Sequence, residues 1–142
     1  MKKPVMLAAL FVIITSAAVA QKLDAAKIPA VVKTACAMKY PGITVKWEKE
    51  GGKYEASFKR NSNSMSAIFE PNGTFTESEI DIKWSELPGT VLAYVQQHYT
   101  GQIIKGAAKI TKADGTVNYE AEVNKKDLVF DANGKFLKEM KD

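Results

Sequence analysis

A seven-residue pattern occurs twice in the chain and restricts the fold more than any other feature. FEPNGTF runs from Phe69 to Phe75, and FDANGKF runs from Phe130 to Phe136. Asn-Gly between two hydrophobic segments favours a tight β-turn, and the flanking phenylalanines lie where hairpin side chains reach the same face. The repeated heptapeptide therefore predicts two β-turns, each closed by a pair of packed aromatic rings.

The similarity between the two halves extends upstream of the heptapeptides. An apolar residue followed by proline, a tyrosine two residues before a glycine, and a Tyr-Glu-Ala triplet occur in the same order before each copy. The matched positions are Ile28-Pro29 with Leu87-Pro88, Tyr40-Pro41-Gly42 with Tyr99-Thr100-Gly101, and Tyr54-Glu55-Ala56 with Tyr119-Glu120-Ala121. Chance rarely preserves several anchors in order, so we predict a duplicated element, roughly residues 27–79 and 86–140.

Each predicted repeat begins with one amphipathic helix and continues with strands. Apolar residues recur at three- and four-residue steps after the prolines, and Gly42 or Gly101 follows where a helix commonly ends. Downstream the period changes to two, with turns at Gly51-Gly52 and Ala113-Asp114-Gly115. The predicted fold class is α+β: a tandem repeat of a helix followed by antiparallel β-strands, with the helices packed on one face of the sheet.

The first twenty residues predict an export signal. Lys2 and Lys3 precede an apolar run from Val5 to Ile14, and Ala18-Val19-Ala20 forms an A-x-A cleavage signal. We predict cleavage after Ala20, a single domain over residues 21–142 that holds both repeats, and a periplasmic or secreted location without stable membrane insertion. An uncleaved membrane anchor is the alternative, although the apolar run is short for a bilayer.

Charge and cysteine content narrow the classes of function. The net charge is +4, and the predicted signal peptide contributes two of its lysines. Acidic and basic residues are interleaved in the remainder, which is not the pattern of a nucleic-acid-binding protein. Cys36 is the only cysteine and can form no internal disulfide. Its place on the apolar face of the first helix predicts a buried thiol, with an intermolecular disulfide as the alternative.

No recognised motif indicates a cofactor or metal site. His98 is the only histidine, and neither a His-x-x-x-His nor a Cys-x-x-Cys spacing occurs. A nucleophile elbow and a glycine-rich phosphate loop are also absent from the sequence. Residues 131–134 resemble the start of a calcium loop, but the later bidentate glutamate is missing, and Glu70-Pro71 stands in the first copy. We therefore expect no cofactor and no metal, and favour the turn.

Glu55 and Glu120 occupy equivalent positions and form the only candidate acid/base pair. Their neighbours along the strands are of mixed charge, as on an ordinary solvated face, and nothing in the sequence indicates a cleft or a raised pKa. We predict that the protein is not an enzyme. An enzyme that uses Glu55, Glu120 and His98 is kept as a third hypothesis, and it requires the three groups to converge in one cleft.

The polar face of the predicted sheet is the candidate surface for a partner. Its charged residues are Lys46, Glu48, Glu55, Lys59, Lys105, Lys109, Glu120 and Glu122. An antiparallel sheet that packs on the core with one face commonly exposes its other face to solvent, so the polar pattern alone does not establish an interface. The two tryptophans distinguish the interpretations: buried, Trp47 and Trp84 belong to the core, and exposed, they are candidate interface anchors.

The sequence resembles a known family. Tyr54-Glu55-Ala56-Ser57-Phe58 with FEPNG, repeated as Tyr119-Glu120-Ala121-Glu122-Val123 with FDANGK, resembles the PepSY-like proteins of bacterial periplasms, which are grouped with the beta-lactamase-inhibitor-protein-like fold. The resemblance covers about residues 27–140, and Pro71 and Thr74 depart from it in the first copy. It implies a tandem α+β fold and a role in binding or inhibiting another exported protein, such as a peptidase or a beta-lactamase. No inhibitory residue can be matched to a position here.

The leading hypothesis is an exported, non-enzymatic binding module, an inhibitor or modulator of another envelope or secreted protein. It would bind a protein or peptide through the sheet face and through the loops around Gly51-Gly52 and Ala113-Asp114-Gly115. The alternative is a small-ligand carrier or sensor in the cell envelope. A deep apolar pocket between helix and sheet would favour the carrier, and a packed core would favour the protein binder.

Overall fold

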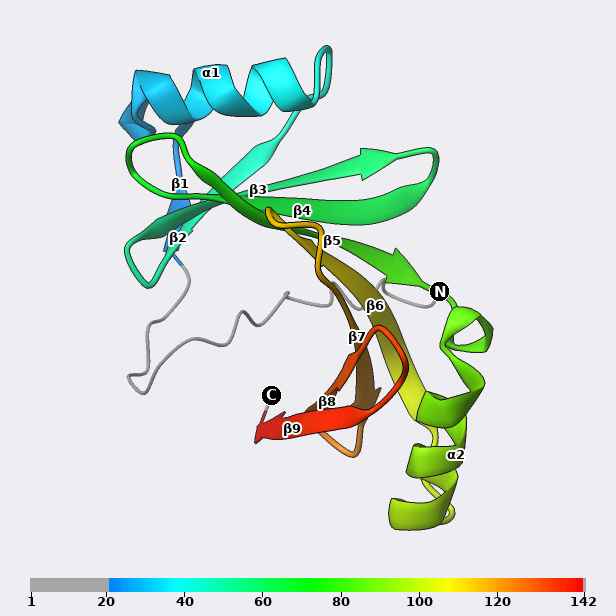
Figure 1. The fold of residues 1–142 in the computed structure, drawn as a ribbon. Coiled ribbons are helices and arrows are strands. Elements are labelled where there is room, and N and C mark those ends of the chain that lie inside the picture. Colours follow the sequence, from blue (N-terminus) through cyan, green and yellow to red (C-terminus); the bar gives the residue numbers. More distant parts are fainter. Residues whose placement is uncertain (1–20, 142) are drawn as a thin grey trace. The chain divides into compact units, whose positions relative to one another are not determined.

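The computed structural model describes residues 21–141 (Figure 1). The predicted signal peptide, residues 1–20, lies outside the described residues. The described part contains two α-helices and nine β-strands. The strands lie in sequence order across one antiparallel sheet. The coarse prediction of an α+β fold with an antiparallel sheet is confirmed. Neither helix of this part is long or apolar enough to cross a membrane.

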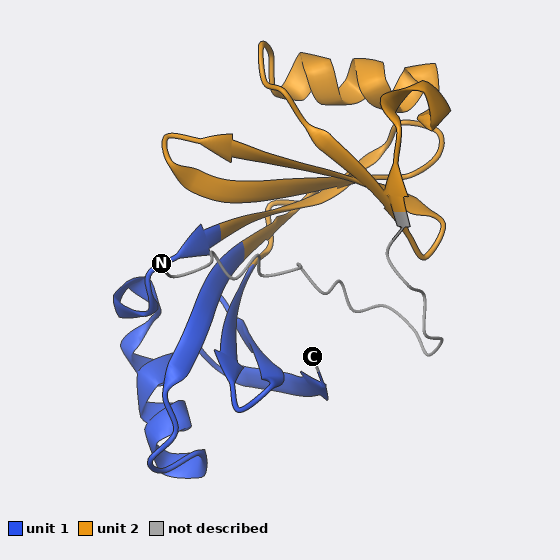
Figure 2. Ribbon diagram, turned by 180° about the vertical axis from the view of Figure 1, so that it is seen from behind, with its two compact units in different colours: residues 1–14, 81–109, 118–142 blue, residues 15–80, 110–117 orange. Residues whose placement is uncertain are grey.

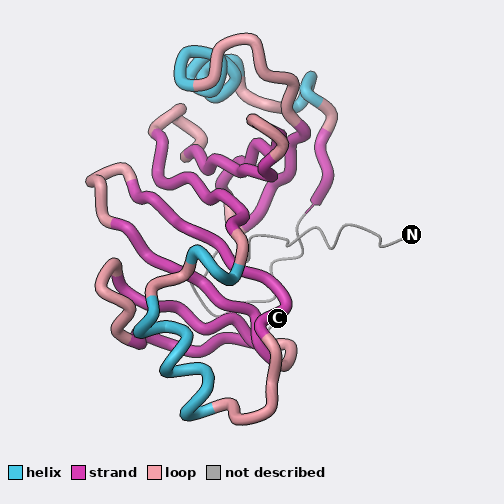
Figure 3. Tube along the Cα trace, turned by 90° about the vertical axis from the view of Figure 1, so that its right-hand side faces the viewer, coloured by secondary structure: helices cyan, strands magenta, loops and turns pink. Residues whose placement is uncertain are grey.

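The strands are short and are joined mainly by tight turns, as Figure 3 shows. Their bounds are β1 (Gln21–Leu23), β2 (Lys46–Glu50), β3 (Lys53–Arg60), β4 (Asn63–Phe69), β5 (Phe75–Ile82), β6 (Ile104–Lys112), β7 (Val117–Val123), β8 (Lys126–Asp131) and β9 (Phe136–Lys141). The helices are α1 (Ala30–Lys39) and α2 (Gly89–His98), preceded by the single 3-10 turns η1 (Ala25–Lys27) and η2 (Trp84–Glu86).

The described residues form two compact units, which Figure 2 shows in different colours. The α1 unit comprises residues 21–80 and 110–117, and the α2 unit comprises residues 81–109 and 118–141. Each unit contains one helix and strands that pair in antiparallel fashion. These are β1 to β4 with most of β5 in the α1 unit, and most of β7 with β8 and β9 in the α2 unit.

Both helices begin and end where proline and glycine predict. Pro29 and Pro88 occupy the residues immediately before the helices, where a missing N–H is not needed. Gly42 and Gly101 follow with φ angles of +75° and +77°, a conformation that glycine adopts without steric cost. These features confirm the predicted helix positions in both units.

Each unit has its own hydrophobic core between the helix and one face of the strands. In the α1 unit, Val32 and Cys36 of α1 pack with alternate residues of β3, including Ala56 and Phe58. Cys36 is buried, as predicted, and its burial raises the pKa of the thiol. Both cores are filled, since several side chains have an exposed fraction of 0%: Val32, Ala56, Ala67, Phe69, Val91, Ala121, Val123, Leu128 and Phe130.

The repeated heptapeptides form tight turns with packed rings, as predicted. The N–H of Gly73 donates to the carbonyl oxygen of Glu70, and that of Gly134 to Asp131, both at 2.9 Å. Ring centroids lie 5.8 Å apart in each phenylalanine pair, with the rings edge to face. The Oδ1 atom of Asp131 accepts the N–H groups of Asn133 and Lys135, each at 2.9 Å, so this carboxylate stabilises the turn.

The second turn is also fixed to the start of helix α2. The hydroxyl of Thr90 donates to the carbonyl oxygen of Asn133 at 2.9 Å. Gly134 is buried against Thr90 and Pro88, and it has a φ angle of +80°. The heptapeptide therefore joins two strands and also contacts the helix of its own unit, a role that its local sequence does not reveal.

Candidate functional site

The structure divides the predicted sheet-face residues into exposed and buried sets. Three are exposed: Lys46, Lys59 and Lys105. Three are half-buried: Glu48, Lys109 and Glu122. Glu55 and Glu120 are buried, with exposed fractions of 7% and 2%. The expectation that these two carboxyl groups lie on a solvated face is wrong.

Glu55 is buried on the face of β3 that points away from α1. Strand alternation directs Tyr54 and Ala56 toward α1 and places Glu55 on the opposite face. That face is not fully exposed to solvent, because Ser66 and Ile68 of the adjacent strand β4 are buried on it as well. A polar position in an alternating strand therefore becomes a buried position here.

The electrostatic setting of Glu55 departs from the sequence expectation of an ordinary carboxyl group. Burial raises the pKa of Glu55 to about 7, and the negative charges of Glu48 and Glu50 add to the increase. The hydroxyl groups of Ser66 and Ser57 favour the ionised form and lower the pKa in part. The Ser57 hydroxyl donates to Glu55 Oε1 at 3.5 Å, whereas Ser66 Oγ lies outside ordinary hydrogen-bond geometry.

The three groups of the enzyme hypothesis do not form one site. His98 is exposed on α2, where its ring stacks on Tyr94 with a centroid distance of 4.2 Å. Tyr119 and Ala121 pack with the α2 core, so alternation places Glu120 on the face of β7 that points away from α2. His98 and Glu120 are thus separated by the strand. Among residues 21–141, no three His, Cys, Asp or Glu side chains are grouped to hold a metal ion.

The two tryptophans have opposite environments. Trp47 is 6% exposed and packs against Phe69 in the α1 core, with ring centroids 6.5 Å apart. Trp84 is 58% exposed and lies on η2, directly between β5 and α2. By the criterion set from the sequence, Trp47 is a core residue and Trp84 is the candidate interface anchor.

The backbone that carries Trp84 is fixed at both ends of its turn. At the start, the Lys83 N–H donates to the Glu86 carboxylate at 2.7 Å, and the Glu86 N–H donates back to the Lys83 carbonyl at 2.9 Å. At the end, the Leu87 N–H donates to the Trp84 carbonyl at 3.2 Å, and the Leu87 side chain is buried in the α2 core. The indole ring is therefore exposed on a constrained backbone.

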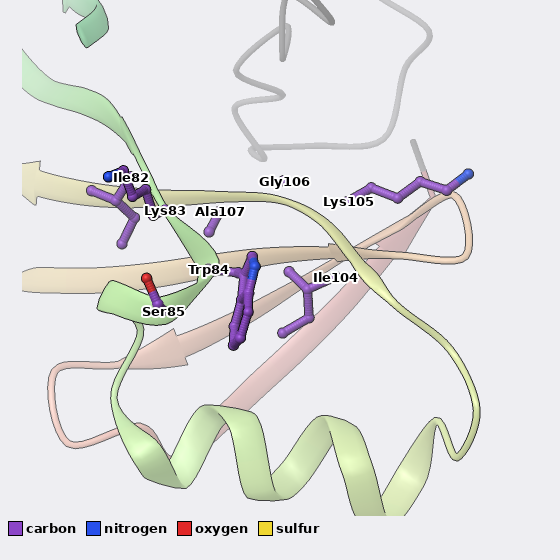
Figure 4. A pocket seen from close by; sticks show the side chains of 8 residues that line it. All are labelled: Ile82, Lys83, Trp84, Ser85, Ile104, Lys105, Gly106 and Ala107. Carbon is purple, nitrogen blue, oxygen red and sulfur yellow. The ribbon is translucent and has the colours of Figure 1, made fainter.

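A shallow pocket of about 300 Å³ lies beside this tryptophan and is called the Trp84 pocket here. Figure 4 shows the indole ring of Trp84 next to the side chain of Ile104, with the side chain of Lys105 extending away from both. Its lining residues, all in the α2 unit, are Ile82, Lys83, Trp84, Ser85, Ile104, Lys105, Gly106 and Ala107. The sequence placed Lys105 on the sheet face but did not connect it with Trp84, because the two are separated by the whole of helix α2.

The fold and the pocket together define a small α+β protein with filled cores and one exposed tryptophan, Trp84. The chain belongs to the PepSY-like family: the family profile, described as "Putative beta-lactamase-inhibitor-like, PepSY-like", matches residues 16–77 and 52–138. The resemblance inferred from the Tyr-Glu-Ala and Asn-Gly motifs is thereby confirmed. No curated protein is significantly similar to the chain.

Three solved structures have a similar fold. A BLIP-like protein from Bacteroides fragilis is 21% identical, with a TM-score of 0.66 over 80% of this chain and 86% of that chain. A DUF2874 family protein from Bacteroides uniformis is 19% identical, with a TM-score of 0.72 over 80% and 88%. A putative periplasmic protein from Bacteroides eggerthii is 17% identical, with a TM-score of 0.72 over the same shares. At these identities the likeness establishes the fold.

Proposed function

We propose that this protein is a periplasmic, non-enzymatic binding module that binds another exported protein or peptide and inhibits or modulates it. The predicted signal peptide supports export, and a similar structure from Bacteroides eggerthii is described as periplasmic. The family description supports an inhibitor-like rather than an enzymatic role. We interpret residues 27–79 and 86–140 as two copies of one helix-and-strand element within a single domain.

The exposed side chain of Trp84 carries this proposal. Tryptophan is enriched among the few residues that dominate binding energy at protein interfaces. An anchor on a constrained backbone also loses less conformational entropy when it binds a partner. Trp84 combines an exposed fraction of 58% with a turn that is hydrogen-bonded at both ends. Its neighbour in the pocket, Ile104, extends the apolar surface available to a partner.

The filled cores favour a protein binder over a small-ligand carrier. A carrier needs a concave pocket that encloses most of its ligand, typically in a range that starts at about 300 Å³. In this chain the space between each helix and its strands is occupied by wholly buried side chains such as Phe69 and Phe130. The Trp84 pocket is of comparable volume but lies at the surface, where it suits one side chain of a larger partner.

The polar face of the sheet is proposed as a secondary contact surface for the partner. Lys46, Lys59 and Lys105 are exposed and remain proposed partner contacts. Glu55 and Glu120 are buried and are assigned a structural role instead. Lysine is generally depleted at interface cores, so these lysines would contribute at the rim and mainly to the rate of association.

Affinity capture from an envelope extract of the native cell tests the proposal. The bait is the chain from Gln21, compared with Trp84→Ala and with Leu137→Ala, which truncates another exposed hydrophobic side chain. We expect one protein to be retained by the wild type and by Leu137→Ala. Trp84→Ala should weaken retention roughly 30-fold, the effect of about 2 kcal/mol for an interface anchor.

Two results would count against the proposal in different ways. If no protein is specifically retained by the wild type, the protein-binding function is contradicted. If Trp84→Ala retains the same partner as strongly as the wild type does, the function stands but Trp84 is not its anchor. A double variant, Lys46→Ala with Lys59→Ala, then measures the contribution of the sheet face.

A further inference from the structure

We propose that the Trp84 pocket binds a peptide segment in which an apolar side chain is flanked by carboxylates. This inference rests on the proposed function and names the chemistry of its ligand. It is carried by the composition of the pocket, which combines apolar and cationic residues. Ile82, Trp84 and Ile104 provide the apolar surface, and Lys83 and Lys105 provide the two positive charges.

The apolar part of the pocket matches one side chain. Trp84 is exposed, Ile104 is half-buried, and the two lie side by side in Figure 4. A volume of about 300 Å³ is small for an enclosed ligand site, and this pocket is open to solvent. A leucine- or phenylalanine-sized group laid against the indole ring would remove apolar area from water, at roughly 25 cal/mol per Å².

The positive charges of Lys83 and Lys105 favour an acidic ligand. Both lysines are exposed, no acidic residue lines the pocket, and neither ammonium group is paired with another residue of the described part. Two acidic residues flank the pocket segment along the chain. Asp81 is half-buried, and burial raises the pKa of its carboxyl group. The carboxylate of Glu86 accepts the backbone N–H of Lys83. Carboxylates on either side of the apolar group would meet complementary charge, and basic peptides would be repelled.

Titration with synthetic peptides, followed by NMR of the indole N–H groups, tests this inference. The chain has two tryptophans, so the Trp84 signal is assigned as the one that disappears in Trp84→Phe. The probe is acetyl-Asp-Glu-Leu-Glu-Asp-amide. The comparison peptides replace leucine by serine or all acidic residues by lysine. We expect the acidic leucine peptide to shift the Trp84 signal, and both comparison peptides to bind at least about tenfold more weakly.

A charge-reversed pair of variants provides the matched control. Lys83→Glu with Lys105→Glu should abolish the preference for the acidic peptide. Lys27→Glu with Lys33→Glu makes the same change in net charge at two exposed lysines of the α1 unit that are not proposed partner contacts, and it should leave the titration unchanged. Trp84→Phe should keep part of the affinity, measured from backbone amide shifts of the surrounding residues, because phenylalanine retains an apolar ring.

Three outcomes would overturn the ligand assignment. They are no shift at millimolar peptide, equal shifts for the leucine and serine peptides, or equal shifts for the acidic and basic peptides. Failure of the ligand assignment can be distinguished from failure of the proposed function. If capture still depends on Trp84, the module binds a protein through this surface, and only the acidic-apolar chemistry is wrong. If the peptide binds but nothing is captured, the binding-module function is wrong.

Discussion

Replacing Gly134 by alanine is expected to lower the free energy of unfolding by about 3 kcal/mol. Two costs add at this position. The residue has a φ angle of +80°, which costs an L-residue with a side chain about 1–2 kcal/mol. A new Cβ atom would also lie 2.9 Å from Thr90 Cβ and 3.4 Å from Pro88 Cβ, so the turn would have to move away from helix α2. Urea unfolding followed by circular dichroism measures the loss.

The variant Gly115→Ala distinguishes the cost of the positive φ angle from the cost of the contact between a new Cβ atom and helix α2. Gly115 occupies the same kind of turn, because its N–H donates to the Lys112 carbonyl at 2.9 Å, and its φ angle is +87°. A Cβ atom there meets nothing within 4 Å. We expect Gly115→Ala to cost only about 1 kcal/mol, and Thr90→Ala to recover part of the loss in a double variant with Gly134→Ala. Equal costs for the two glycine variants would contradict the proposed contact between the turn and the helix.

Replacing Glu55 by glutamine is expected to remove about 3 kcal/mol of pH dependence from the stability of the protein. The pKa of Glu55 is about 7 in the native state against an ordinary value of 4.5. The native protein therefore binds more protons than the unfolded chain between these values, and raising the pH through this window destabilises it. Glutamine has nearly the same shape and no charge, so the variant should match the wild type near pH 4 and exceed it near pH 8.

The free energy of unfolding from urea titrations at a series of pH values gives this difference directly. Glu70→Gln is the control, because it removes a half-exposed carboxylate of the same unit, one that is paired with Lys53 at 3.0 Å. The control should not reproduce the pH-dependent gain. A difference between Glu55→Gln and wild type that stays constant from pH 4 to pH 8 would show that Glu55 titrates normally and is not desolvated.

Local chemistry accounts for the parts of the fold that were predictable. Pro29 and Pro88 before the helices, and the two Asn-Gly turns, act through backbone geometry that depends on few neighbours. The change of period from 3.6 to 2 identified the strands that follow each helix. Strand β1 was not predicted, since three residues carry too little periodic signal and depend on their pairing with β2.

The features that the sequence did not predict depend on contacts between residues that are distant along the chain. Alternation in β3 shows that Glu55 faces away from α1, but not whether that face meets water, and this is why its burial and raised pKa were missed. The contact between Gly134 and Thr90 joins positions on different elements and leaves no local pattern. Trp84 was recognised as informative, but its exposure follows from the hydrogen-bonded turn between β5 and α2.

The family relationship and the site support the same kind of function by separate routes. The family profile is described as beta-lactamase-inhibitor-like. In this chain, the exposed aromatic residue at the Trp84 pocket offers a physical basis for binding a protein. The buried carboxyl groups of Glu55 and Glu120 are unsuited to direct contact with a partner. The raised pKa of Glu55 instead makes the stability of the fold depend on pH.

Site-specific photo-crosslinking in the native envelope tests whether the surface around Trp84 binds the partner. A photoreactive phenylalanine analogue is placed at position 84, and in separate samples at the exposed positions of Lys46 and Leu137. We expect one crosslinked partner from position 84, none from position 137, and at most weak crosslinking from position 46. A partner captured from position 46 but not from position 84 would contradict the account, because the sheet face would then be the binding surface.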